Sequence, residues 1–165
     1  MGARYNWRQT LAHFAAISGV LAGFCVTFIA LILGGPVADY EICTTRVTFG
    51  QTAVLLFGVS TGLFVCAAEL FLLSKEYDVF DLSEPYRQFL KENIVGEKKE
   101  EWKRFEDETT ERCRQNEKLG RYFYNSAIFI VFFGLLFAIA PYNAVIAIIV
   151  FLLGIILESW QMIRK

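Results

Sequence analysis

Three ionisable residues stand inside or at the edge of long apolar stretches, and they are the side chains best placed to do chemistry. They are His13, Glu69 and Glu158. Ionisable groups at membrane depth are energetically costly, so they usually pair with polar groups or line a water-filled path. Two hypotheses follow. Either Glu69 and Glu158 form an acidic site at the mouth of a cation path, with His13 as a partner, or they reach water and hydrogen-bond to a neighbouring helix.

The remaining residue types offer little for catalysis. One histidine and two glutamates on separate segments lack the spacing of a metal site, so we predict no metal. A single histidine leaves only one base for a Ser-His-Asp arrangement and excludes haem held by two histidines of one chain. Neither a phosphate-binding glycine loop nor an H-E-x-x-H motif occurs. We therefore expect a protein that is not an enzyme and needs no cofactor.

The cysteines and the net charge exclude further classes. Cys25, Cys43, Cys66 and Cys113 form no CxxC pair, which indicates neither a disulfide framework nor a zinc site. We expect free thiols, although a bridge between molecules at Cys43 stays open. A net charge of −1 at pH 7 gives no electrostatic reason to expect a nucleic-acid partner.

The ionisable residues His13, Glu69 and Glu158 belong to or border four stretches of the chain that carry almost no other charge. Hydrophobic residues make up 55% of the chain, and charged residues gather between the stretches and at the two ends. Stretches that are apolar on every side are typical of membrane spans. We predict an all-α membrane protein of one domain, residues 1–165, in which four helices form a bundle. The predicted spans are residues 10–33, 48–73, 122–140 and 143–159.

The basic residues predict how the spans are oriented. With four crossings, all of the 16 Lys and Arg residues except Arg46 lie on one side of the bilayer. Loops rich in Lys and Arg stay in the cytoplasm. The N- and C-termini are therefore predicted to be cytoplasmic, in a membrane that the sequence does not identify. The third and fourth spans, joined only by Pro141, Tyr142 and Asn143, must form a tight antiparallel hairpin.

Small residues recur on one face of each predicted span, where they would let helix backbones approach closely. The positions we interpret as helix-packing residues are Ala15, Gly19, Gly23, Gly58, Gly62, Gly134 and Gly154. Glu69 lies seven residues after Gly62 and therefore shares its face. The sequence leaves open whether these contacts form within one chain or between chains, or whether small residues are simply common in such helices.

The segment 74–120 is much longer than a connection between two spans requires. We predict a helical cytoplasmic extension with two parts. A short amphipathic helix follows Asp81 and ends at Gly96, and a second helix begins at Glu97 and continues into the third span. Trp102 and Phe105, one turn apart, could form a partner-docking surface, or the helix could be merely solvated and rich in ion pairs.

Taken together, these features favour a non-catalytic multi-pass membrane protein that acts through helix–helix assembly. Its expected partners are the lipid bilayer and either further copies of itself or a larger membrane protein. The alternative is an oligomeric ion channel or transporter with acidic residues at its cytoplasmic mouth.

Overall fold

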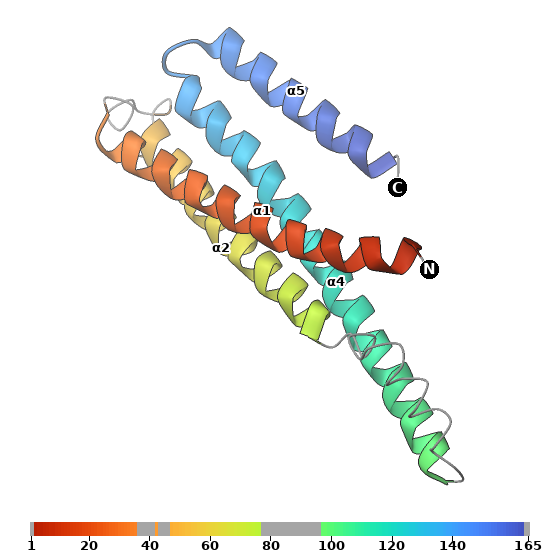
Figure 1. Ribbon diagram of the computed structural model, residues 1–165. Coiled ribbons are helices and arrows are strands. Elements are labelled where there is room, and N and C mark those ends of the chain that lie inside the picture. The colour runs from red at the N-terminus through yellow and green to blue at the C-terminus, as the bar shows by residue number, and fades with distance from the viewer. Residues whose placement is uncertain (1, 36–41, 43–46, 77–96, 164–165) are drawn as a thin grey trace.

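The protein is all-helical over the residues that its computed structural model describes, which are 2–35, 42, 47–76 and 97–163. The helices are α1 (Gly2–Leu33), α2 (Phe49–Glu76), α4 (Glu97–Ile139) and α5 (Ala144–Ile163) (Figure 1). The short amphipathic helix predicted after Asp81, together with Cys43 and Arg46, lies outside the described residues.

Three of these helices are long and apolar enough to cross a membrane. The qualifying segments are Thr10–Leu33, Phe49–Ser74 and the apolar part of Lys99–Ile139. A shorter apolar helix, Ala144–Ile156, lies at the start of α5. Length and composition thus identify a chain of the membrane-protein type, in agreement with the uncharged stretches of the sequence.

Helix α4 is the longest element, with 43 residues in one unbroken helix. The prediction that a helix beginning at Glu97 continues into the third apolar stretch is confirmed. At ~1.5 Å per residue, α4 is about 64 Å long, roughly twice the ~30 Å of a hydrocarbon layer. Its charged N-terminal half projects beyond the ends of α1 and α2 (Figure 1).

Two helix starts are fixed by local hydrogen bonds of the kind that the sequence encodes. At α2, the Gln51 amide donates to Thr48 Oγ1 and the Thr48 amide donates to Gln51 Oε1, both at 3.1 Å. This reciprocal pair is a capping box. At α5, Asn143 Oδ1 accepts from the amides of Val145 and Ile146 at 3.1 Å. The Asn143 cap starts α5 directly after α4, so the two helices form the expected antiparallel hairpin.

The four described helices do not contribute equally to the core. Helix α2 lies between α1 and α4 and packs extensively against both, whereas α1 and α4 approach each other closely at few positions. Helix α5 packs on α4 and makes no comparable contact with α1 or α2. The arrangement differs from an evenly packed four-helix bundle: α1, α2 and α4 form the core, and α5 is attached through α4.

Candidate functional site

The contact between α2 and α4 follows a seven-residue repeat. Phe57, Phe64 and Phe71 of α2 are each at most 1% exposed, and they recur once every two helical turns. The facing positions of α4 repeat with the same spacing and carry small residues: Cys113, Gly120, Ala127 and Gly134. Such a repeat keeps one face of each helix against its partner along the whole contact.

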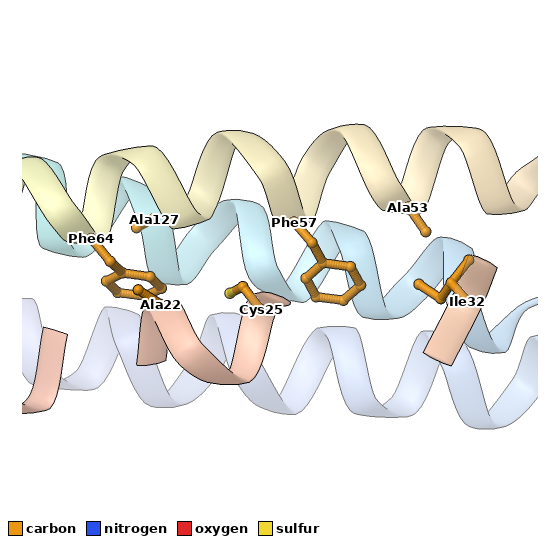
Figure 2. Packing of buried hydrophobic residues seen from close by; sticks show 7 residues of the cluster. All are labelled: Ala22, Cys25, Ile32, Ala53, Phe57, Phe64 and Ala127. Carbon is orange, nitrogen blue, oxygen red and sulfur yellow. The ribbon is translucent and has the colours of Figure 1, made fainter. Parts of the chain in front are cut away.

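Each phenylalanine ring occupies the space that a small residue leaves. A Cβ atom added at Gly134 would lie 3.1 Å from the Phe57 ring, and one at Gly120 would lie 3.1 Å from the Phe71 ring. Phe64 and Ala127 belong to the same buried cluster between these two levels (Figure 2). The sequence reasoning missed this repeat, because it searched for small residues at four-residue spacing. Three phenylalanines at seven-residue spacing were the signal that could have revealed it.

A reciprocal pair of hydrogen bonds continues this contact toward the charged part of α4. Ser74 Oγ donates to the Cys113 carbonyl at 3.2 Å, and Cys113 Sγ donates to the Ser74 carbonyl at 3.1 Å. Both residues are buried. The C-terminal end of α2 is therefore fixed to α4 beyond the last phenylalanine.

The contact between α1 and α2 sets the antiparallel register of the two helices. The Phe14 and Phe71 rings stack with centroids 5.4 Å apart, and the Phe28 and Phe57 rings stack at 5.2 Å. Between these pairs, Cys25 of α1 is buried in the same cluster as Phe57 and Phe64 of α2. Each step toward the C-terminus of α1 thus matches one step toward the N-terminus of α2.

Arg121 marks the level at which the apolar part of α4 begins. Its guanidinium donates from Nε and Nη2 to Glu117 Oε1, at 2.9 and 2.6 Å, and lies 5.7 Å from the centre of the Phe14 ring. Phe14 therefore connects α1 both to the ionic end of α4 and to Phe71. Arg121 and Phe14 therefore lie where the charged part of α4 gives way to its apolar part.

Unlike Ser74, other hydroxyl groups of the described core donate to carbonyls of their own helices. Ser18, Ser60 and Thr61 donate to the carbonyls of Phe14, Leu56 and Phe57, at 2.8–2.9 Å. Such a bond uses the proton of the hydroxyl group, and the oxygen can still accept a hydrogen bond. Buried polar side chains are few among the described residues, namely Ser18, Ser60, Ser74 and Thr109, so the described core is mainly apolar.

The ionisable residues that the sequence identifies do not meet one another in the described part of the chain. His13 and Glu69 are exposed, on α1 and α2, and neither is hydrogen-bonded or ion-paired there. Glu158 lies in α5, and its side chain is not among those described. No group of three or more His, Cys, Asp or Glu side chains that could hold a metal occurs in that part of the chain.

The seven predicted helix-packing residues fall into two groups. Ala15 is buried, Gly134 meets Phe57, and a Cβ atom at Gly154 would overlap the Phe132 ring of α4. By contrast, a Cβ atom at the other four positions would have nothing within 4 Å: Gly19, Gly23, Gly58 and Gly62. One group is used for packing within the chain, whereas the other leaves α1 and α2 with open faces.

Trp102 and Phe105 contact each other on the charged part of α4, with ring centroids 5.8 Å apart. Phe105 is 51% exposed, and the ion pairs on this segment join residues within α4, as in Arg112–Glu108 and Arg114–Glu111. The two aromatic rings therefore form a small apolar spot on an otherwise charged helix.

The candidate functional surface consists of the two faces of α1 and α2 that point away from the core. We define each by six residues that are all exposed and recur at alternating spacings of three and four. The outer face of α1 consists of His13, Ala16, Val20, Gly23, Thr27 and Ala30. The outer face of α2 consists of Leu55, Gly58, Gly62, Val65, Glu69 and Leu72.

Comparison with protein-family models, with curated proteins and with solved structures gives no match. The two outer faces and the core that holds them are thus the features of the molecule that bear on its function.

Proposed function

We propose that the chain is a four-span membrane protein with both termini in the cytoplasm. The length of α4 supports this, because its charged half cannot fit in the hydrocarbon layer together with the apolar half. The short connection from α4 to α5 returns the chain to the side from which α4 entered. Basic residues that gather at the ends and in the segment 74–120 then face the cytoplasm.

The orientation can be tested with an epitope tag fused after Lys165. In intact cells the tag is expected to be inaccessible to antibody, and it becomes accessible when the membrane is permeabilised. A tag inserted between α1 and α2 is the matched control, expected to be accessible from outside without permeabilisation. Labelling of the C-terminal tag in intact cells would contradict this topology.

We further propose that the protein is non-catalytic and works by assembling with other membrane helices, either in further copies of itself or in a larger complex. The observation that carries this proposal is the division of α2 into two faces. One face is filled by Phe57, Phe64 and Phe71 against α4, so the chain needs no other contact there to fold. The opposite face combines open glycines with an ionisable residue, Glu69, inside an apolar helix.

The energetics of the bilayer favour a partner on that face. An ionisable residue within a span is disfavoured by about 2.5–3.5 kcal/mol at the middle of the membrane and by less near its edge. Glu69 lies five residues before Ser74, or about 7.5 Å along the helix. A polar group from another helix can hydrogen-bond to Glu69 and offset this free-energy cost. Gly58 and Gly62 let that helix approach closely.

Native mass measurement in mild detergent or in lipid nanodiscs tests the assembly proposal. The expected result is a species heavier than one 18.8 kDa chain, persisting at membrane-like protein density. Isolated single chains under all these conditions, with no membrane protein co-purifying from the native host, would contradict it.

A channel or transporter is the alternative, and the exposure of Glu69 is the observation that favours it. Since the described core is mainly apolar and Glu69 lies on the exposed face of α2, an ion path would run between copies, with Glu69 lining it. Liposome flux distinguishes the two functions. Flux by the purified protein that falls in Glu69→Gln supports the channel, whereas absent flux, or flux unchanged by the substitution, removes it.

A further inference from the structure

The stacked aromatic pairs of α1 and α2 fix which residues of the two outer faces lie at the same height. Because Phe14 is level with Phe71 and Phe28 with Phe57, the register can be carried along both helices. Ala16 then lies level with Glu69, and Gly23 lies level with Gly62. The other four pairs at equal height follow in the same way: His13 with Leu72, Val20 with Val65, Thr27 with Gly58, and Ala30 with Leu55.

All twelve residues of the two outer faces are used once in this pairing, and none is left unmatched. Copies of a membrane protein that share one orientation are related by rotation about the membrane normal, which leaves every residue at its own depth. The outer face of α1 in one copy can therefore meet the outer face of α2 in the next copy in this same register. At three of the six levels a glycine or alanine faces a larger residue, and at a fourth Gly23 faces Gly62, so the two backbones can approach closely.

The ionisable residues determine which pair of faces is complementary. If two α2 helices met through their own outer faces, two Glu69 carboxylates would lie opposite each other, and like charges at such a distance repel. When α1 meets α2 instead, His13 lies at the level of Leu72, three residues or ~4.5 Å along the axis from Glu69. An imidazole N–H can donate a hydrogen bond to a carboxylate across such an offset, so this pair of faces brings a donor to Glu69.

We propose that a second copy of this chain docks the outer face of its α1 on the outer face of α2, placing its His13 beside Glu69. This proposal rests on the assembly function proposed above and names its partner and its contact. Because one copy uses α1 and the other uses α2, the contact is heterologous, and it repeats either into a closed ring or into an open array. In a closed ring, each copy then has a neighbour on the outer face of its α1 and another on the outer face of its α2.

Cysteine cross-linking in native membranes tests the register directly. Two differently tagged chains, one with Val20→Cys and one with Val65→Cys, are co-expressed in a background in which Cys43 and Cys66 are changed to Ala. The expected result is a cross-linked product that carries both tags. The matched control replaces Val65→Cys with Ser126→Cys, which is also exposed and lies at about the level of Val65 but on α4, and is expected to give no such product.

The results of cross-linking and of native mass measurement together distinguish failure of the α1–α2 contact from failure of the assembly proposal. Cross-linking of Val65→Cys with itself, and not with Val20→Cys, would show a symmetric α2 contact and overturn the proposal while leaving assembly intact. An assembled species by native mass without any cross-link between positions 20 and 65 would do the same. Single chains by native mass would overturn both.

A second test, which does not depend on cysteine, places a bulky residue at Gly23 or Gly62, where the two helix backbones of neighbouring copies would approach most closely. In Gly23→Ile and in Gly62→Ile, the added side chain meets open space within the chain, so the fold is expected to persist. Association between copies is expected to weaken by about tenfold, equivalent to about 1.4 kcal/mol. Ser126→Ile, at an exposed position of α4, is the control and should leave association unchanged. Unchanged association in both glycine variants would overturn the proposal.

Discussion

The two faces of α2 are built from opposite residue types and have opposite environments. The face toward α4 presents phenylalanine rings that are almost wholly buried, and α4 supplies the small residues that accommodate them. The outer face presents its own small residues, Gly58 and Gly62, and among the described residues no ring fills the space beside them. A glycine therefore marks a close contact only where a neighbouring helix provides a large side chain. One face therefore holds the chain together, whereas the other is open within the described residues and is the face to which we assign the proposed assembly.

The largest expected effect is on the face of α2 that packs against α4 through Phe57, Phe64 and Phe71, which we call the closed face, and it comes from Phe64→Ala. The ring is buried between α1, α2 and α4, so its removal leaves a cavity that the surrounding helices cannot fully close. Such truncations lower the free energy of unfolding by about 3–5 kcal/mol. Thermal unfolding in detergent measures the loss. The matched control is Phe24→Ala, because that ring is 57% exposed on α1 and its removal should change stability little.

A large loss in both phenylalanine variants would contradict the contrast between faces. It would mean that Phe24 also packs in the folded state, for instance against a neighbouring copy. Repeating the measurement at high dilution in detergent, where copies separate, would then identify that contribution.

Two glycines provide the next test: Gly134 of α4, which contacts the closed face of α2, and Gly58 on the outer face of α2. In Gly134→Leu, the new side chain must enter space occupied by the Phe57 ring, which lies 3.1 Å from the ideal Cβ position. Overpacking of this kind costs about 1–3 kcal/mol. In Gly58→Leu, nothing lies within 4 Å of the new Cβ, so the stability of the single chain should be unaffected. Equal losses in unfolding free energy would show that the outer face is not open within one chain.

The positions of the helices could be predicted from the sequence, but the partners of their faces could not. Absence of charge over some twenty residues locates an apolar helix without reference to any other part of the chain. Gly58 and Gly134, however, have the same appearance in sequence, since each is a glycine in an apolar helix with small residues one or two turns away. What separates them is a ring from another helix, at Gly134 only, and that depends on the relative register of α2 and α4. The seven-residue repeat of phenylalanine contains this information, but only if the partner helix is known.

The ionisable residues show the same limit. The sequence places Glu69 on the small-residue face and near one end of an apolar helix, and the helix geometry follows directly from that spacing. Whether the face is directed inward or outward depends on where Phe57, Phe64 and Phe71 point, because they occupy the opposite side of α2. A strong aromatic face thus determines the environment of a glutamate that it never touches.

The smallest effect concerns the end of the closed face, where hydrogen bonds replace aromatic packing. Ser74→Ala removes the bond from Ser74 Oγ to the Cys113 carbonyl but leaves that carbonyl within α4, where it still accepts a helical hydrogen bond. The net contribution of such a bond is about 0.5–1.5 kcal/mol. The loss should be local, so hydrogen exchange is the suitable measurement, and faster exchange is expected at the last turn of α2 than at the level of Phe57. Cys113→Ser is the matched control, because its hydroxyl can still donate to the Ser74 carbonyl. If Ser74→Ala instead accelerated exchange along all of α2, the aromatic repeat would not be sufficient to hold the closed face, and the division between a structural and an assembling face would fail.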